Sequence, residues 1–384
     1  MIKKTLTLIL VLSLILMPMQ GMGEVMLRLG GAYDLAVDDQ GNIWGWGDNT
    51  RDQLGNGGGG KVFFPEKAAV GLDGNDILDI QCGNVGTLFL LKDGSVFVCG
   101  SNEYGQTGLN NGKGKETLPV RIPGLENIVQ VSCGWGHCLA LTGDGHVYSW
   151  GRNNMGQLGV GDRKNRPEPV LLSLEHIVQI ECGGKFCMAM DAEGKLFGWG
   201  ANDYGQLAGA SKSKWVGEPV ELPLNNKFSS VCCGGGSVYG LCPDGSILSW
   251  GQNDYLQLGR KTRGAFTPEA GEVELPEGVQ IKTLQAYNGH VSLLDTQGRL
   301  FVWGCLAHGQ ANTGKRPSKS LPVEATPDAP VLMAAVGSVQ SAAVLENGRV
   351  VTIGGSEYGQ SGAFSKSIYY VTTWADTELD LLSQ

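Results

Sequence analysis

One short motif occurs seven times in this chain, and this repetition constrains the fold more than any other feature. In its clearest copy, residues 144–159 contain an Asp-Gly turn, a short alternating strand that ends at Trp150, and a glycine-rich loop. The glycine that closes the strand recurs every 49 to 53 residues, at Gly47, Gly100, Gly151, Gly200, Gly251, Gly304 and Gly354. A glutamine follows six residues after each one, from Gln53 to Gln360. A period near 50 residues, made of short strands and turns, predicts a β-propeller.

Each repeat contains four strand-like segments. In the clearest copy these are residues 128–134, 138–142, 146–150 and a segment that begins near Pro169. Proline has no backbone donor for a sheet ladder, so the fourth segment is expected to be the edge strand of an antiparallel blade. The sequence therefore predicts an all-β protein with one seven-bladed propeller of four-stranded blades over residues 24–384. The segment 368–374 is expected to form the last outer strand.

The repeat resembles the regulator of chromosome condensation repeat family over about residues 24–370. The matching features are the Val-x-Cys-Gly strand at 131–134, the Asp-Gly turn, and the Trp-Gly-x-Asn-x-x-Gly-Gln-Leu-Gly loop from Trp150. The resemblance implies a closed seven-bladed ring. The resemblance also implies nucleotide exchange on a small GTPase, but that activity depends on a long insertion in one blade, and the even spacing leaves no room for one. A secreted family member that inhibits β-lactamases uses a similar propeller face.

Residues 1–23 have the pattern of a signal peptide. Lys3 and Lys4 precede an apolar stretch from Leu6 to Met17, and the small residues 21–23 suit cleavage. The apolar stretch is short for a membrane span, so the mature chain is expected to be secreted or extracytoplasmic with no membrane span. Retention as an uncleaved anchor is the alternative. The formal net charge of −9 disfavours nucleic-acid binding.

The ten cysteines are interpreted mainly as buried, reduced thiols. Cys82, Cys133, Cys182 and Cys233 share one repeat position, where a small apolar side chain fits between crowded inner strands. The spacings of Cys133 with Cys138, and of Cys182 with Cys187, also allow bridges across a hairpin turn. That alternative stays open at the level of sequence.

The polar residues that recur in every copy are interpreted as structural. The glutamines are expected to satisfy buried loop backbone groups, and the asparagines two residues after the strand glycine are expected to be turn residues. The stretch 55–61 resembles a phosphate loop, but Val62 cannot hold magnesium and no helix follows. The sequence contains no metal-ligand pattern and no catalytic motif, so it predicts a non-enzyme with no cofactor and no metal site.

Binding residues are expected where the copies differ. The turn between the first and second segments carries a different residue in most copies, which indicates a surface position on the same face as the long loops. Basic side chains also gather in these loops, either as solvated charge or as a rim that steers an anionic partner. The predicted binding residues are Tyr33, His137, Phe186, Ser237, His290, Arg163, Lys164, Arg166, Arg260, Lys261, Arg263, Lys315 and Arg316.

The sequence therefore predicts an exported, monomeric, non-catalytic scaffold that binds a protein partner through this loop face. Two alternatives remain: a guanine-nucleotide-exchange-type regulator of a small GTPase, and a carbohydrate-binding or enzymatic propeller that uses its central channel. Fold alone does not decide among them.

Overall fold

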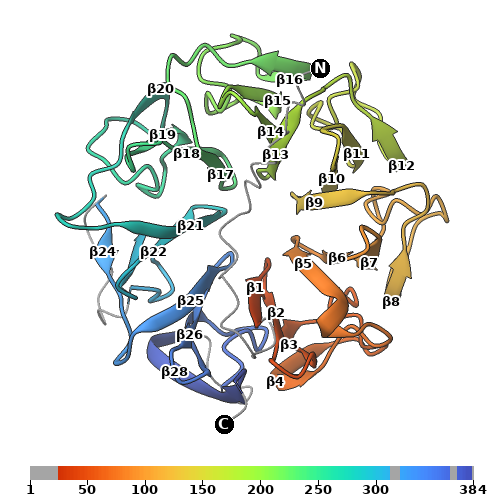
Figure 1. Ribbon diagram of the computed structural model, residues 1–384, viewed down its shortest axis with the longest axis vertical. Helices are drawn as coiled ribbons and strands as arrows, with labels where there is room; N and C mark the ends of the chain where they lie inside the picture. Colours follow the sequence, from red (N-terminus) through yellow and green to blue (C-terminus); the bar gives the residue numbers. More distant parts are fainter. Residues whose placement is uncertain (1–24, 312–320, 364–369, 383–384) are drawn as a thin grey trace, which may run out of the picture.

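The computed structural model describes residues 25–311, 321–363 and 370–382, and it contains seven four-stranded antiparallel sheets arranged around a central axis (Figure 1). Each sheet is one blade, made of four strands that are consecutive in the chain. The prediction of an all-β, seven-bladed propeller is confirmed. The predicted signal peptide lies outside the described residues.

The blades follow one another around the ring in chain order. Blade 1 contains β1 (Met26–Leu29), β2 (Tyr33–Val37), β3 (Ile43–Asp48) and β4 (Lys61–Lys67), followed by the short 3-10 helix η1 (Gly74–Asp76). Blade 2 contains β5 (Ile77–Cys82), β6 (Gly86–Leu91), β7 (Val96–Ser101) and β8 (Lys115–Arg121). Blade 3 contains β9 (Ile128–Cys133), β10 (His137–Thr142), β11 (Val147–Gly151) and β12 (Arg166–Leu171). Blade 4 contains β13 (Ile177–Cys182), β14 (Phe186–Asp191), β15 (Leu196–Ala201) and β16 (Trp215–Glu221).

The remaining three blades complete the ring. Blade 5 contains β17 (Ser230–Cys233), β18 (Ser237–Leu241), β19 (Ile247–Gln252) and β20 (Phe266–Glu272). Blade 6 contains β21 (Ile281–Tyr287), β22 (His290–Asp295), β23 (Leu300–Gly304) and β24 (Val323–Glu324). Blade 7 contains β25 (Val331–Val336), β26 (Gln340–Leu345), β27 (Arg349–Gly355) and β28 (Tyr370–Asp380). In every blade the first strand lies nearest the axis and the fourth forms the outer edge (Figure 1).

A repeated hydrogen bond joins neighbouring blades. The indole Nε1 of the strand tryptophan donates to the backbone oxygen of the loop glutamine in the preceding blade, over 2.8–3.1 Å. The five tryptophans in this role are fully buried: Trp46, Trp150, Trp199, Trp250 and Trp303. A buried indole needs such an acceptor, so the tryptophan position fixes the spacing of adjacent blades.

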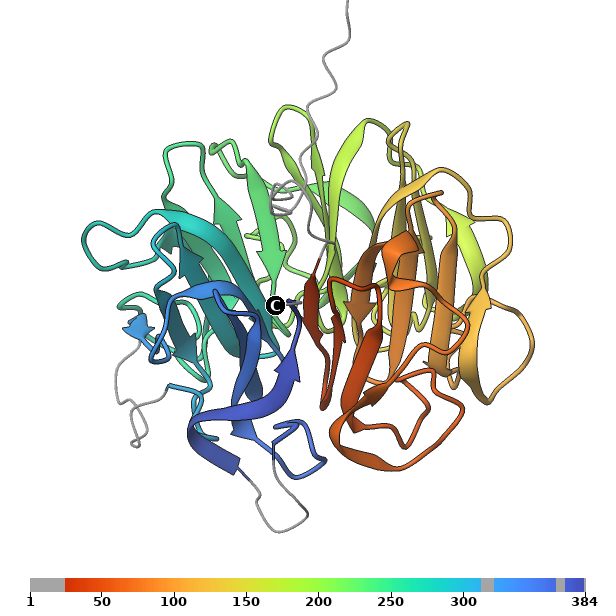
Figure 2. The same cartoon turned by 60° about the horizontal axis from the view of Figure 1, so that its bottom comes forward.

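The recurring glutamine and asparagine side chains order the long loops, as predicted. Each of the seven glutamine Oε1 atoms accepts a hydrogen bond from the backbone N–H two residues earlier. The five asparagine Oδ1 atoms accept from the backbone N–H five residues later, over 2.9–3.2 Å. These loops therefore hold their shape through internal bonds, and they extend from one side of the disc (Figure 2).

The ring closes by contact between blade 1 and blade 7, without exchange of strands. Trp46 of blade 1 donates to the backbone oxygen of Gln360 in blade 7, and Asp39 N–H donates to the backbone oxygen of Leu381. The outer strand β28 begins at Tyr370, in agreement with the predicted last strand. In the described part of the chain, no helix is both long and apolar enough to cross a membrane.

Candidate functional site

The side chains predicted to form a variable surface ring are buried. Tyr33, His137, Phe186, Ser237 and His290 each have 0% of their surface exposed. The interpretation that this position faces a surface is therefore wrong. A docked partner cannot contact these side chains in this structure.

Contacts between blades explain both the burial and the variation. In four of the five cases the side chain lies over the glycine that follows the inner strand of its own blade; a Cβ at Gly134, for example, would collide with the His137 ring. It then reaches the following blade. The Tyr33 hydroxyl donates to the backbone oxygen of Gly86 over 2.7 Å, and His290 Nε2 lies 3.3 Å from Ser341 Oγ. Tyr33, His137 and His290 each meet different atoms of the following blade, so the position varies although it is buried.

The predicted basic residues divide into two groups. Arg166 forms an ion pair with Asp162 over 2.8 Å, and the Arg260 guanidinium donates to the backbone oxygens of Ser249 and Glu269. These two side chains brace their own loops.

The other predicted basic side chains on the loop face are exposed: Arg163, Lys164, Lys261 and Arg263. The Lys261 ammonium lies 3.3 Å from Glu274, but its side chain keeps 79% of its surface exposed. Lys315 and Arg316 lie outside the described residues. The structure therefore leaves four of the predicted basic residues able to meet a partner.

Aromatic side chains also lie on the loop face in blades 4 and 5, and one of them contacts an exposed basic side chain of blade 3. This feature was missed at the level of sequence. The Arg163 guanidinium lies over the Trp215 ring, 5.0 Å from its centroid. Tyr204 packs edge-on against Phe266 with ring centroids 6.4 Å apart, and Phe266 is 49% exposed. Tyr255 is 54% exposed. We refer to Arg163, Lys164, Tyr204, Trp215, Tyr255, Arg263 and Phe266 as the aromatic loop patch.

The loop tyrosines also have a structural role. Tyr104, Tyr204 and Tyr255 each pack on the turn glycine between the first two strands of the following blade. These contacts place the long loops and those turns on one face of the disc, the loop face. The patch is therefore held in place by packing between blades.

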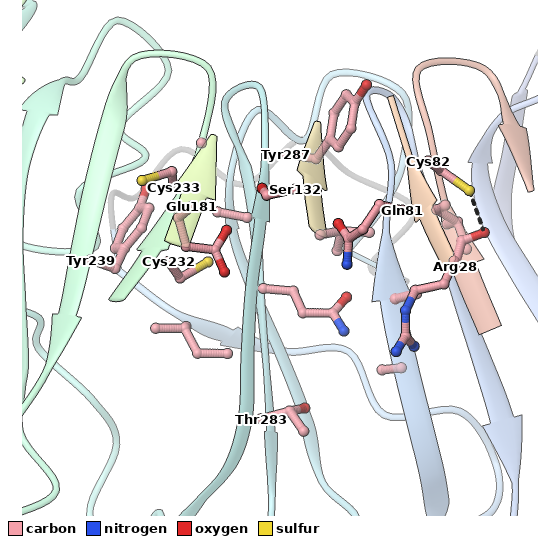
Figure 3. Close-up of a pocket in the computed structure, with 18 of the residues that line it drawn as sticks. Arg28, Gln81, Cys82, Ser132, Glu181, Cys232, Cys233, Tyr239, Thr283 and Tyr287 are labelled. Atoms are coloured by element: carbon pink, nitrogen blue, oxygen red, sulfur yellow. Dashed lines mark hydrogen bonds between the residues drawn. The ribbon is translucent and has the colours of Figure 1, made fainter. Parts of the chain in front are cut away.

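A channel with a volume of about 900 Å³ runs along the axis and is lined by the inner strands. Figure 3 shows Arg28, Gln81 and Glu181 projecting into it from three different blades. The Arg28 guanidinium forms an ion pair with Asp79 over 2.8 Å, and Gln81 Nε2 donates to the same carboxylate over 2.7 Å. The channel can therefore offer polar groups to a small molecule.

Trp135 crosses the loop-face end of the channel. It belongs to the turn between β9 and β10 of blade 3, and its indole Nε1 donates to Asn288 Oδ1 of blade 6 over 3.0 Å. Its ring packs against Gly184 and Gly235 of the two blades between them, and its backbone N–H donates to the oxygen of Gly184. A side chain at either glycine would displace the ring, so these residues let Trp135 cover that end.

Among the acidic residues that line the channel, Glu181 has the environment that most favours the neutral form of its carboxyl group. Burial raises the pKa of its carboxyl from 4.5 to about 8, and the nearby Cys182 and Asp79 act in the same direction. The Gln179 amide, which hydrogen-bonds the carboxylate, opposes the shift. At neutral pH this carboxyl therefore offers a donor as well as an acceptor.

The four cysteines at the shared repeat position line the channel. Cys82, Cys182 and Cys233 are buried and Cys133 is partly buried, and all ten cysteines are free thiols. Within the described residues, one group can offer three metal ligands: His137, Cys182 and Cys187, between blades 3 and 4.

Comparison with known proteins agrees with this geometry. A family model described as the RCC1-like domain matches residues 11–323. The chain belongs to the RCC1-like domain family. The structure agrees with this assignment, because it has the seven blades that the repeat predicts and the repeated tryptophan and glutamine residues join neighbouring blades.

Relatives of this RCC1-like propeller include proteins of very different size. The human E3 ubiquitin-protein ligase HERC2 is 30% identical over 347 residues, which cover 86% of this chain but only 7% of HERC2. The ultraviolet-B receptor UVR8 of Arabidopsis thaliana is 28% identical, over 88% of this chain and 78% of the receptor.

Two solved structures are similar along most of their length. Human WBSCR16 has a TM-score of 0.74 and 28% identity, and the match covers 82% of this chain and 85% of that one. Prp20p of Saccharomyces cerevisiae, whose binding to Gsp1p and histones has been described, has a TM-score of 0.78 and 22% identity. That match covers 88% of this chain and 86% of Prp20p, and it supports the fold alone.

Proposed function

We propose that this RCC1-like propeller is an exported, non-catalytic protein that binds an anionic protein partner through the aromatic loop patch. The observation that carries the proposal is the combination of exposed Arg163, Lys164 and Arg263 with Trp215, Tyr255 and Phe266 on one face. Protein interfaces are enriched in Tyr, Trp, Phe and Arg, and such residues contribute most of the binding free energy.

Charge supports an acidic partner surface. The whole chain has a formal net charge of −9, whereas the aromatic loop patch carries three basic side chains. Complementary charge accelerates association and fixes the docking register, and salt screens the effect over about 10 Å at 0.1 M. Binding is therefore expected to weaken at high salt while the aromatic contacts persist.

The test compares two triple variants of equal charge change. The patch variant is Arg163→Glu, Lys164→Glu and Arg263→Glu. The control is Lys92→Glu, Lys195→Glu and Lys227→Glu, which changes exposed lysines near the turns on the opposite face. Captured proteins from the native surroundings are quantified by mass spectrometry at two salt concentrations.

We expect a partner that the wild type and the control capture and the patch variant loses, with little change in thermal stability, because exposed charges contribute little to folding. A partner captured equally by all three proteins would contradict the loop-face assignment. A partner lost only from the control would place the interface on the opposite face.

The channel supports a second candidate function, the binding of a small polar ligand. Its carrying observation is a 900 Å³ space that Trp135 covers at one end and that Arg28, Gln81 and Glu181 line with polar groups. Native mass spectrometry of protein from its source would reveal a bound small molecule. A ligand that remains after Glu181→Gln and Gln81→Ala would lie outside the channel.

A further inference from the structure

Three buried side chains with metal-binding atoms meet between blades 3 and 4. His137 Nε2 of β10 lies 3.2 Å from Cys187 Sγ of β14, and Cys187 Sγ lies 3.9 Å from Cys182 Sγ of β13. All three ligand atoms lie within 4.8 Å of one another. His137 and Cys187 have no exposed surface, and Cys182 is 7% exposed.

The fold holds these side chains in place. Cys182 and Cys187 are direct cross-strand partners in the antiparallel pair β13–β14. Gly134 leaves the space that the His137 ring fills, and this brings the ring from blade 3 to the two thiols of blade 4. The other ring nitrogen, His137 Nδ1, is buried without a hydrogen-bond partner in the structure. Buried polar atoms nearly always have a hydrogen-bond partner, and this nitrogen has none.

From this geometry we propose that His137 Nε2 and the thiolates of Cys182 and Cys187 bind one thiophilic d10 cation, Zn²⁺ or Cu⁺. Around a tetrahedral zinc ion, sulfur ligands at about 2.3 Å and nitrogen at about 2.1 Å lie roughly 3.5–3.8 Å apart. The observed separations of 3.2 and 3.9 Å require only small shifts to reach these values. Thiolate and imidazole ligands favour these two ions.

The proton and charge balance suits a buried site. Binding displaces one proton from each thiol to solvent, and two thiolates with a neutral imidazole leave a zinc site with no net charge.

Among the described residues, a histidine meets two facing cysteines at one boundary between blades, that of blades 3 and 4. At the preceding seam, Cys133 and Cys138 lie directly opposite with sulfurs 3.2 Å apart, but Gly86 stands where His137 stands here. At the following seam, Phe186 and Val238 replace two of the ligands. The Cys133–Cys138 pair therefore serves as an internal control with two thiols and no imidazole.

The experiment uses the full chain, reduced and stripped with a chelator, and titrates Zn²⁺ alone and Cu⁺ alone against a competing chromogenic chelator. Substitution with Co²⁺ adds a spectroscopic signature of thiolate ligation. The variants are Cys187→Ser and His137→Gln, with Cys138→Ser as the matched control. Thermal unfolding without metal establishes that each variant folds.

We expect one equivalent of at least one ion to bind the wild type and Cys138→Ser, and to raise their unfolding temperature. Cys187→Ser should bind roughly tenfold or more weakly and lose the thiolate spectrum. The proposal is overturned if neither ion competes with the chelator, or if Cys187→Ser binds as tightly as the wild type. A Cys182–Cys187 disulfide that excludes both ions in the purified protein would also overturn it.

Discussion

Replacing Trp46 with phenylalanine tests whether the Trp–Gln hydrogen bond stabilises the contact between blades 1 and 7 as much as it does the contact between two blades that are consecutive in the chain. The Trp46 indole donates over 3.1 Å to the backbone oxygen of Gln360, and both residues are buried. The change leaves that oxygen without a partner, at a cost of about 1–3 kcal/mol. The smaller ring also leaves a void of roughly 40 Å³, which at about 24 cal/mol per Å³ adds about 1 kcal/mol. The free energy of unfolding should fall by about 2–4 kcal/mol.

Trp199→Phe is the matched control, because its indole makes the same bond to Gln157 over 3.0 Å between two blades that the chain already connects. Urea unfolding of both variants, followed by circular dichroism, measures the two losses independently of tryptophan fluorescence. Similar losses would mean that the closing seam is as tightly packed as an internal one. A loss below about 0.5 kcal/mol for Trp46→Phe, with the expected loss for Trp199→Phe, would refute the closed-ring account.

Three further predictions follow from single features of the structure. Gly134→Ala should destabilise the fold by about 2–3 kcal/mol, because the new Cβ collides with His137, whereas Gly114→Ala, with open space around it, should be nearly neutral in the same unfolding assay. The free energy of unfolding should decrease as pH rises from 4.5 to about 8, because folded Glu181 retains a proton that the unfolded chain releases; Glu181→Gln should reduce this slope. Alkylation of the chelator-treated, unfolded chain without reductant should label ten thiols, and fewer would reveal disulfides.

The repeat made the architecture predictable from sequence. A glutamine at one offset in all seven copies indicated a structural requirement, and each of these side chains does order its own loop. The edge position of the fourth strand was also predictable, because proline recurs in it. Residues that recur in every copy serve the blade structure that all copies share, so their roles could be predicted from the sequence.

Features that occur once were harder to predict. His137, Tyr33 and His290 vary as surface residues do, but each fits a side chain of the following blade. A single sequence does not reveal that such positions change together with their neighbours. Trp215 and Phe266 could have been noticed, since they begin outer strands where Lys61 and Lys115 stand in blades 1 and 2. The channel groups were missed because inward-facing residues differ between blades.

The contacts between blades separate the parts of this protein that build the fold from the parts that can carry its function. The Trp–Gln bonds recur around the ring and would serve any propeller of this family. Three departures from the repeat involve blades 3 to 5. Arg163 meets Trp215, Trp135 extends from blade 3 over the end of the channel, and His137 meets Cys182 and Cys187. A metal ion bound by His137, Cys182 and Cys187 would join blade 3 to blade 4, the two blades that also supply Arg163 and Trp215. Rigidity at that seam lowers the cost of ordering the patch when a partner binds, so the proposed metal site and the proposed interface would act in the same direction.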